Sequence, residues 1–145
     1  MINEDSKNLI KFFESCSLTA YQCPAKIWTI GWGSTKYSNG TKVKPGDKIT
    51  QQQADELFDT MIKEFETGVK KLVKVTINDN QLGALVSFAY NCGLGNLASS
   101  TLLKKLNASD FEGADKEFQK WTKGAGKVLP GLVKRRLQEA TLFKK

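Results

Sequence analysis

The chain has 145 residues and a formal net charge of +7, and 40% of its residues are hydrophobic against 26% that are charged. These values are typical of one globular domain, or of a small two-lobed one, and exclude a disordered or fibrous protein. The absence of histidine excludes Ser-His-Asp and Cys-His catalytic arrangements and most zinc sites. No nucleotide-binding loop or cofactor motif is visible, so we expect neither a cofactor nor a metal. Any catalysis must then depend on carboxylates, Cys, Thr, Lys or Tyr.

The first third of the chain predicts a short helix followed by a small sheet. Asn3 or Asp5 can cap a helix over residues 3–14, because either side chain can accept a hydrogen bond from the first helical N–H groups. We expect this helix to end near Glu14. Residues 17–45 are rich in Thr, Tyr, Trp, Ile and Val and are punctuated by Gly and Pro, which is typical of a β-hairpin or small sheet.

A long helix and then several shorter ones are expected from residue 50 onward. Thr50 and Gln53 form a capping box, and apolar residues follow at steps of three and four as far as Leu72. Further helices are predicted from Asn78, over about Ser100–Leu106, from a capping box of Ser109 and Glu112, and after Pro130–Gly131. Breaks between them are predicted at residues 91–95 and at the turn 124–126.

These elements predict an α+β fold in a single domain over residues 1–145. A small lobe with a short hairpin sheet covers about residues 15–60, and the long helix joins it to a larger all-helical lobe at residues 61–145. Two lobes joined by one helix leave a cleft, where ligands tend to bind. We expect the helix at residues 3–14 to lie at this cleft.

The positive charge is concentrated at the C-terminal end. Residues 116–145 contain nine basic and two acidic side chains, whereas the two signs balance in residues 1–115. Such a segment would attract a polyanion, namely nucleic acid, an anionic membrane or a bacterial wall, unless it is simply a solvated basic helix. No run is apolar enough to span a bilayer and residues 1–7 have no signal-peptide pattern, so we expect synthesis in the cytoplasm.

A glutamate at a helix end, close to two tryptophans, is the first candidate site. Partial burial of Glu14 would favour its protonated form, which a general acid needs to cleave a glycosidic bond at neutral pH. Trp28 and Trp32 offer flat apolar faces on which sugar rings could lie. From these features alone, a Glu14 exposed to water at the end of its helix is the alternative interpretation.

Glu14, Cys23 and Thr29 are separated by eight and then five residues, and Trp-Thr-Ile-Gly-Trp-Gly continues from Trp28 to Gly33. This pattern resembles the phage-type lysozyme (endolysin) family, whose motif is Glu, eight residues, Asp or Cys, five residues and Thr. The resemblance continues in order through three later segments: residues 87–95, residues 100–103, and Trp121 with residues 129–139. It therefore covers nearly the whole chain and implies the lysozyme-like α+β fold.

The resemblance implies hydrolysis of the β-1,4 bond between N-acetylmuramic acid and N-acetylglucosamine in peptidoglycan, for lysis of a host cell. Glu14 corresponds to the acid that protonates the leaving oxygen, and Thr29 to the residue that helps to hold the attacking water. The residues corresponding to glycan contacts are Tyr21, Trp28, Gly33, Tyr90, Asn91 and Thr101. Packing or capping is the alternative role for the last three.

Two further expectations concern charged and sulfur-containing residues. Arg135 or Arg136 could pair with Glu14 across the cleft, or could simply lie on the surface. Cys23 stands where a carboxylate is usual in the family, so a two-carboxylate mechanism cannot be assumed. A thiol has a reference pKa of about 8.5. As a thiolate Cys23 could activate water or attack the sugar, and as a neutral thiol it could only shape the water site; water activation is favoured because the family usually inverts the anomeric carbon.

A second cysteine adds a possible regulatory disulfide between Cys16 and Cys23. This bond would block the catalytic thiol, so that the oxidised protein would be inactive and the reduced protein active. It requires the two Cα atoms to approach within about 7 Å, and the alternative is two thiols in a reducing cytoplasm. Cys92 is expected in the core.

The expected partners are the glycan strands of peptidoglycan and, if no membrane anchor was removed, a holin that releases the protein to the periplasm. There it would act on the wall as a monomer, with no nucleic acid. A lytic transglycosylase is the alternative enzyme, since it also needs one acidic Glu but produces a 1,6-anhydro end. A non-catalytic protein that binds the wall or nucleic acid through its basic tail is the alternative from another class.

Overall fold

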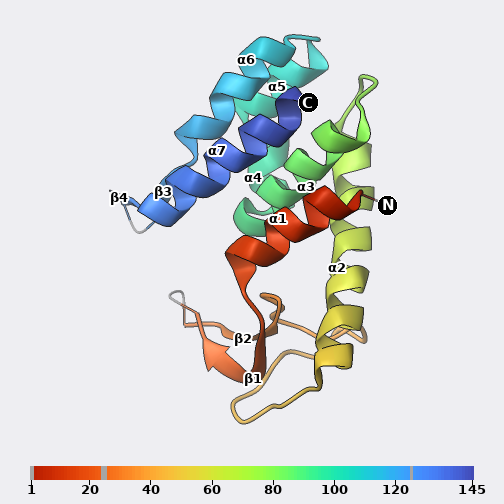
Figure 1. Ribbon diagram of the computed structural model, residues 1–145, viewed down its shortest axis with the longest axis vertical. Helices are drawn as coiled ribbons and strands as arrows, with labels where there is room; N and C mark the ends of the chain where they lie inside the picture. The colour runs from red at the N-terminus through yellow and green to blue at the C-terminus, as the bar shows by residue number, and fades with distance from the viewer. Residues whose placement is uncertain (1, 24–25, 125) are drawn as a thin grey trace. The chain divides into compact units, whose positions relative to one another are not determined.

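The computed structural model describes residues 2–23, 26–124 and 126–145, and the chain divides into two compact units (Figure 1). Residues 14–64 form the hairpin unit, and residues 1–13 with 65–145 form the helical unit. The elements in chain order are α1 (Glu4–Glu14), β1 (Ser17–Gln22), β2 (Trp28–Gly31), α2 (Gln51–Leu72), α3 (Asp79–Cys92), α4 (Leu94–Ser99), α5 (Thr101–Asn107), α6 (Phe111–Glu117), the 3-10 helix η1 (Phe118–Lys120), β3 (Lys123–Gly124), β4 (Lys127–Val128) and α7 (Pro130–Lys144). The predicted α+β class is confirmed.

The hairpin unit is built around one antiparallel pair of short strands. β1 pairs with β2 in a register that places Tyr21 opposite Thr29, and the pairing is irregular between Ser17 and Tyr21. Beneath the strands lies a small core of Ile30, Val43 and Leu57, which the partly buried side chains of Ala20, Trp28, Tyr37 and Ile49 complete. The prediction of a small sheet in residues 17–45 is therefore confirmed, with the α2 side chain Leu57 covering it.

Helix α2 begins where the capping box predicted it. The N–H of Thr50 donates to Gln53 Oε1 at 2.8 Å, and the N–H of Gln53 donates to Thr50 Oγ1 at 3.1 Å. The helix contributes residues 51–64 to the hairpin unit and 65–72 to the helical unit. In the second part, a Cβ on Gly68 would lie 2.5 Å from the Leu94 side chain. Glycine is needed there because α4 packs directly against the helix backbone.

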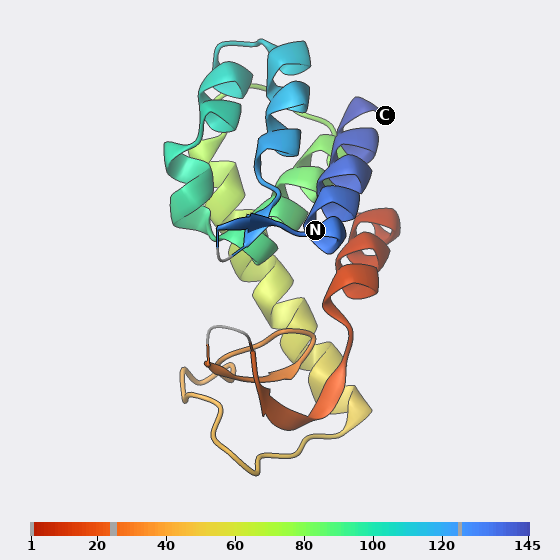
Figure 2. The same ribbon diagram turned by 90° about the vertical axis from the view of Figure 1, so that its left-hand side faces the viewer.

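Helix α3 is the centre of the helical unit. Every residue from Leu82 to Ala89 is buried, which is expected of a helix that is covered on all sides. α7 packs along α3 (Figures 1 and 2), and the Phe88 ring lies 6.0 Å from Phe118 and 5.2 Å from Trp121, edge to face in both cases. A Cβ on Gly83 would collide with the side chain of Ser6 on α1. The close approach of α1 to α3 therefore depends on this glycine.

Two predictions for the middle of the chain need correction. The break predicted at residues 91–95 is confined to Gly93, because α3 continues through Cys92 and α4 begins at Leu94; Gly93 has φ of 95°, a conformation that favours glycine. The capping box at Ser109 is wrong: Asp110 caps α6 instead, accepting from the Gly113 N–H at 2.9 Å.

The last part of the chain agrees with the pattern except in detail. Ala125, the middle of the turn predicted at 124–126, lies outside the described residues, and the residues on either side form the short β3–β4 ladder. α7 begins at Pro130 itself and not after Gly131, since proline has no N–H to leave unpaired at the first helical position. Within the described ranges, no helix is both long and apolar enough to cross a membrane.

Candidate active site

Glu14 is the last residue of α1 and is half-buried. Ser15 follows it directly and adopts φ of 60° before β1 begins at Ser17. This left-handed residue costs conformational energy for a side chain other than glycine. It joins the end of α1 to the hairpin by a short connection and so holds the carboxyl group next to β1.

One backbone carbonyl links the second and third residues of the motif. Ile27 O accepts the N–H of Cys23 at 3.0 Å and the hydroxyl of Thr29 at 3.0 Å. Cys23 is half-buried and Thr29 is only 4% exposed. The hairpin therefore holds both residues around a single acceptor. The five residues that separate Cys23 from Thr29 in the sequence match the length of the connection from β1 to β2.

Tyr21 joins this group from the neighbouring strand. It is the register partner of Thr29, and partners in an antiparallel pair project from the same face of the sheet. Burial raises the pKa of the Tyr21 phenol, and the negative charges of Glu14 and Cys23 raise it further. The Tyr21 side chain thus interacts electrostatically with both of these groups. A phenol is already protonated at neutral pH at its ordinary pKa of about 10, and the upward shift in pKa acts in the same direction.

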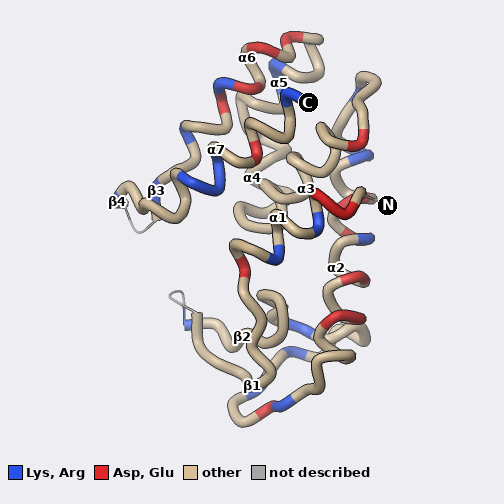
Figure 3. Tube along the Cα trace, in the orientation of Figure 1, with Lys and Arg blue, Asp and Glu red and all other residues tan. Residues whose placement is uncertain are grey.

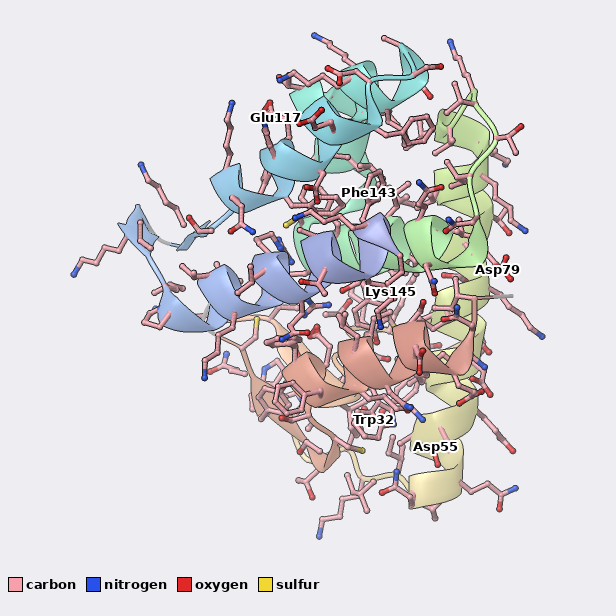
Figure 4. All side chains as sticks on the ribbon, turned by 45° about the horizontal axis from the view of Figure 1, so that its top comes forward. Trp32, Asp55, Asp79, Glu117, Phe143 and Lys145 are labelled. Atoms are coloured by element: carbon pink, nitrogen blue, oxygen red, sulfur yellow. The ribbon has the colours of Figure 1, made fainter. Side chains whose placement is uncertain are left out.

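The two tryptophans are held differently from each other. Trp28 is half-buried and packs against the Ile30 core of the hairpin unit. Trp32 donates its indole N–H to Asp55 Oδ1 at 2.9 Å, and its ring lies 6.1 Å from Phe58, so it fastens the loop to α2 (Figure 4). Gly33 has φ of 92°, so the turn after Trp32 favours glycine for its backbone, and the contact of Gly33 with glycan remains a prediction.

The other three expected glycan contacts belong to the helical unit. The Tyr90 ring packs against Phe65 with centroids 5.3 Å apart, which fits the packing alternative while leaving the side chain half-buried. Asn91 is exposed at the end of α3, and Thr101 is exposed at the first position of α5. Their contact with glycan remains a prediction.

A buried charge cluster in the helical unit was missed by the sequence analysis. Glu139 of α7 is fully buried and lies 2.7 Å from Arg136 Nε and 3.4 Å from Arg135 Nε. Ser87 donates its hydroxyl to Glu139 Oε2 at 2.5 Å. The interpretation of the arginines as surface residues is therefore wrong. The signal that could have found the cluster is the spacing of three and four residues between these arginines and the only acid of α7.

The environment of this cluster shows why it tolerates burial. Arg136 also donates to Cys92 Sγ at 2.8 Å and lies over the Phe88 ring at 5.1 Å, while Arg135 donates to the carbonyl of Ser87 at 3.1 Å. Burial raises the pKa of Glu139, against the opposing effect of the arginines and of the Ser87 hydroxyl. Burial also raises the pKa of the Cys92 thiol, although Arg136 opposes it. Cys92 is half-buried at the end of α3, where we expected a core residue.

Cys16 and Cys23 lie at opposite ends of strand β1. All three cysteines carry thiols and no disulfide, and the six residues of β1 separate these two. At the usual rise of a strand their Cα atoms are on the order of 20 Å apart, well beyond the reach of a disulfide. The bond between Cys16 and Cys23 would therefore require β1 to be dismantled. Across the described ranges, no three His, Cys, Asp or Glu side chains are grouped so as to hold a metal ion.

Comparisons with known proteins identify the family of this chain. Residues 11–139 match the family described as phage lysozyme. The chain is 49% identical over 98% of its length to an endolysin of Bacillus phage B103, of which the match covers 53%, so the chain spans about half the length of that relative. It is 42% identical to an endolysin of Acyrthosiphon pisum secondary endosymbiont phage 1, covering 98% of this chain and 97% of that one. Among solved structures, an endolysin from Escherichia coli O157:H7 phage FAHEc1 is similar, with a TM-score of 0.89 and 35% identity over 99% of this chain and 92% of that chain.

Proposed function

Because the chain belongs to the phage lysozyme family, we propose that it acts as an endolysin: a muramidase that hydrolyses the β-1,4 bond between N-acetylmuramic acid and N-acetylglucosamine in peptidoglycan. The observation that carries this proposal is the hairpin unit itself. In it Tyr21 is the register partner of Thr29, Cys23 and Thr29 share the Ile27 carbonyl, and Glu14 and Cys23 both act on the pKa of Tyr21.

Each of these residues has a role that its position supports. Glu14 protonates the leaving glycosidic oxygen. Thr29 and Cys23, which share the Ile27 carbonyl, hold the attacking water on the other side of the sugar ring. The neutral Tyr21 phenol donates a hydrogen bond to a substrate oxygen or to the carboxylate that forms when Glu14 has given up its proton. Trp28, Gly33, Tyr90, Asn91 and Thr101 contribute to the glycan surface.

The experiment that tests the proposal is the loss of turbidity of purified cell walls. Glu14→Gln removes the acidic proton and should abolish lysis, by at least the 10²-fold that general acid catalysis supplies. Glu4→Gln is the matched control, since Glu4 lies on the same helix with an exposed side chain paired to Lys7 at 3.8 Å. Full lysis by Glu14→Gln would contradict the proposal. The mass of the products distinguishes the alternative enzyme, because a lytic transglycosylase leaves fragments lighter by one water.

The role of Cys23 is tested separately by stereochemistry. If Cys23 helps water to attack directly, the anomer first formed is inverted, whereas attack by the sulfur itself gives retention. NMR of the first product distinguishes the two. Cys23→Ser keeps a polar group of similar size and should reduce lysis if a thiolate is needed, but should preserve most of it if the thiol only shapes the water site.

We also propose that oxidation of Cys16 and Cys23 to a disulfide switches the enzyme off. The strand geometry bears on the consequence of the bond: forming it requires β1, which carries Tyr21, to be dismantled, so the oxidised protein would lose part of the site. In this reaction the two thiols lose two electrons and two protons to an external disulfide oxidant such as oxidised glutathione. Intact-mass analysis after alkylation, beside the lysis assay, tests the switch. Cys16→Ser should lyse walls equally with and without reductant, and equal activity of oxidised and reduced wild type would refute it.

The expected setting follows from the same proposal. The substrate is the glycan strand of the bacterial wall, which the protein would meet in the periplasm after synthesis in the host cytoplasm and release by a holin. The positive charge supports attraction to an anionic wall. We expect a monomer that does not use nucleic acid as a ligand, which sedimentation and a DNA-binding assay at physiological salt can check.

A further inference from the structure

The groove between α1 and α7 exposes an unusual amount of apolar surface. Both helices belong to the helical unit and run side by side (Figures 1 and 2). Leu9 and Phe12 of α1 and Leu137 of α7 line a groove of about 660 Å³ between them. The Phe12 side chain is 77% exposed and the Leu137 side chain is 53% exposed. An exposed phenylalanine beside an exposed leucine indicates a surface that is covered when the protein meets its partner.

Helix α7 extends this apolar surface beyond the groove. Leu129, at the N-cap, and Val133 and Leu137 follow one another at steps of four residues, so they lie in one row on the helix, and all three are exposed. The opposite side of the same helix buries Arg135 and Glu139. The helix thus carries its only acid inside and a row of apolar side chains outside. The helix also buries Ala140, Leu142 and Phe143, so the exposed row is a second apolar side, in addition to the one that faces the core.

Exposed lysines border the apolar row. Lys127, Lys134 and Lys145 are exposed, and Lys134 and Lys145 line the groove itself. Figure 3 shows in blue the Lys and Arg positions along α7. Two carboxylates lie near the far end: Asp5 lines the groove and Asp115 pairs with Lys144 at 3.3 Å. The end of the groove near Phe12 and Lys134 has no acidic side chain in its lining. We call Phe12, Leu129, Val133 and Leu137 with the lysines Lys127, Lys134 and Lys145 the α1–α7 face.

We propose that the α1–α7 face binds the surface of an anionic phospholipid membrane. Apolar side chains flanked by lysines are the combination that such a surface binds, because the rings and branched chains enter the acyl boundary while the ammonium groups stay among the phosphates. A soluble polyanion would use the lysines but would gain nothing from Phe12. A second copy of the chain packed on the same face would bring its lysines against these lysines. This binding is separate from hydrolysis of the wall and does not depend on it.

The test is co-sedimentation of the full chain with phosphatidylethanolamine vesicles that contain roughly one quarter phosphatidylglycerol, beside phosphatidylcholine vesicles. We expect binding to the anionic vesicles alone. Phe12→Ser should weaken it about tenfold, and Lys134→Gln about fivefold. Leu18→Ser on β1 and Lys104→Gln on α5 remove an exposed apolar and an exposed basic side chain elsewhere and should leave binding unchanged. Glu14→Gln should bind as the wild type does, which separates this result from the outcome of the lysis assay.

Three outcomes would overturn the proposal. One is no binding to the anionic vesicles, and another is an equal loss in Lys104→Gln and Lys134→Gln, which would show attraction by net charge alone. The third is binding that Phe12→Ser leaves unchanged and that soluble polyphosphate competes away, which would assign the face to a soluble polyanion. Dimerisation in sedimentation that Phe12→Ser abolishes, with no vesicle binding, would assign it to a second copy.

Discussion

The substitution Glu139→Gln removes the negative charge at the centre of the buried cluster while keeping the size of the side chain. Two guanidinium groups, Arg135 at 3% exposure and Arg136 at 0%, would then lose the carboxylate that pairs with both of them in the core. The NH₂ group of the new amide is a hydrogen-bond donor, and it would face another donor, either an arginine or the hydroxyl of Ser87. Breaking a buried ion pair by removing one partner costs about 3–5 kcal/mol.

This loss is large for a chain of 145 residues, since a domain has a free energy of unfolding of only about 5–15 kcal/mol. It corresponds to a fall in Tm of roughly 10–15 °C, at about 3 °C for each kcal/mol. Denaturant unfolding followed by far-UV circular dichroism measures the free energy, and a thermal scan measures Tm. The fit to a two-state transition should hold in both proteins for the comparison to be valid.

The matched control is Glu112→Gln, which breaks an ion pair with Lys116 at 3.8 Å in which both side chains are more than two-thirds exposed. An exposed pair of this kind contributes at most about 0.5 kcal/mol. If Glu139→Gln is no more destabilising than Glu112→Gln, then Glu139 does not stabilise the two arginines and the account of the cluster given above is refuted. Ser87→Ala should give an intermediate loss of about 1–2 kcal/mol.

Two further predictions concern the contacts of single residues. Gly83→Ala places a methyl group where an α1 side chain packs and should lower the free energy of unfolding by about 1–3 kcal/mol. Gly131→Ala in α7 places its methyl group in open space and should raise the free energy of unfolding by about 0.5–1 kcal/mol. Equal effects of the two substitutions in urea titrations would contradict this expectation. The Lys44 N–H and then the Tyr37 hydroxyl lower the pKa of Asp47, so its stabilising effect is present above the unfolded pKa of about 4 and is lost as the pH falls through the lower folded value. Asp47→Asn should therefore be less stable than wild type at pH about 6 and approach it at pH about 3, and a constant difference across this range would be the contrary result.

Much of the local structure could be predicted because it depends on neighbours in the sequence. The capping box of Thr50 and Gln53 forms as expected, since both hydrogen bonds lie within one helical turn. Where a local pattern failed, a local competitor replaced it: Asp110, one residue after Ser109, caps α6. The residues on both sides of Gly93 are helical, so the loop expected over five residues is reduced to Gly93 alone, which has a positive φ.

The candidate site was predictable in part for the same reason. The separation between Cys23 and Thr29 reflects one hairpin connection, and the motif therefore identifies both residues. The pattern could not show that Cys16 and Cys23 stand at opposite ends of a strand, because seven residues can span a few ångströms or on the order of 20 Å, depending on their conformation. The pattern also could not show that the Tyr21 phenol interacts electrostatically with both Glu14 and Cys23.

The sequence by itself determined the helical periods, the hairpin, the family motif and the total charge, all of which depend on residue order or composition. Only the tertiary structure decided which charges of the C-terminal segment face the solvent. Arg135 and Arg136 lie in the core on Glu139, while Val133 and Leu137 lie outside beside lysines. The physical reason is that burial is set by α1 and α3, which are distant in the sequence. An ion pair within one helix can be recognised from its spacing, but the side of the helix that enters the core is chosen by its packing partners.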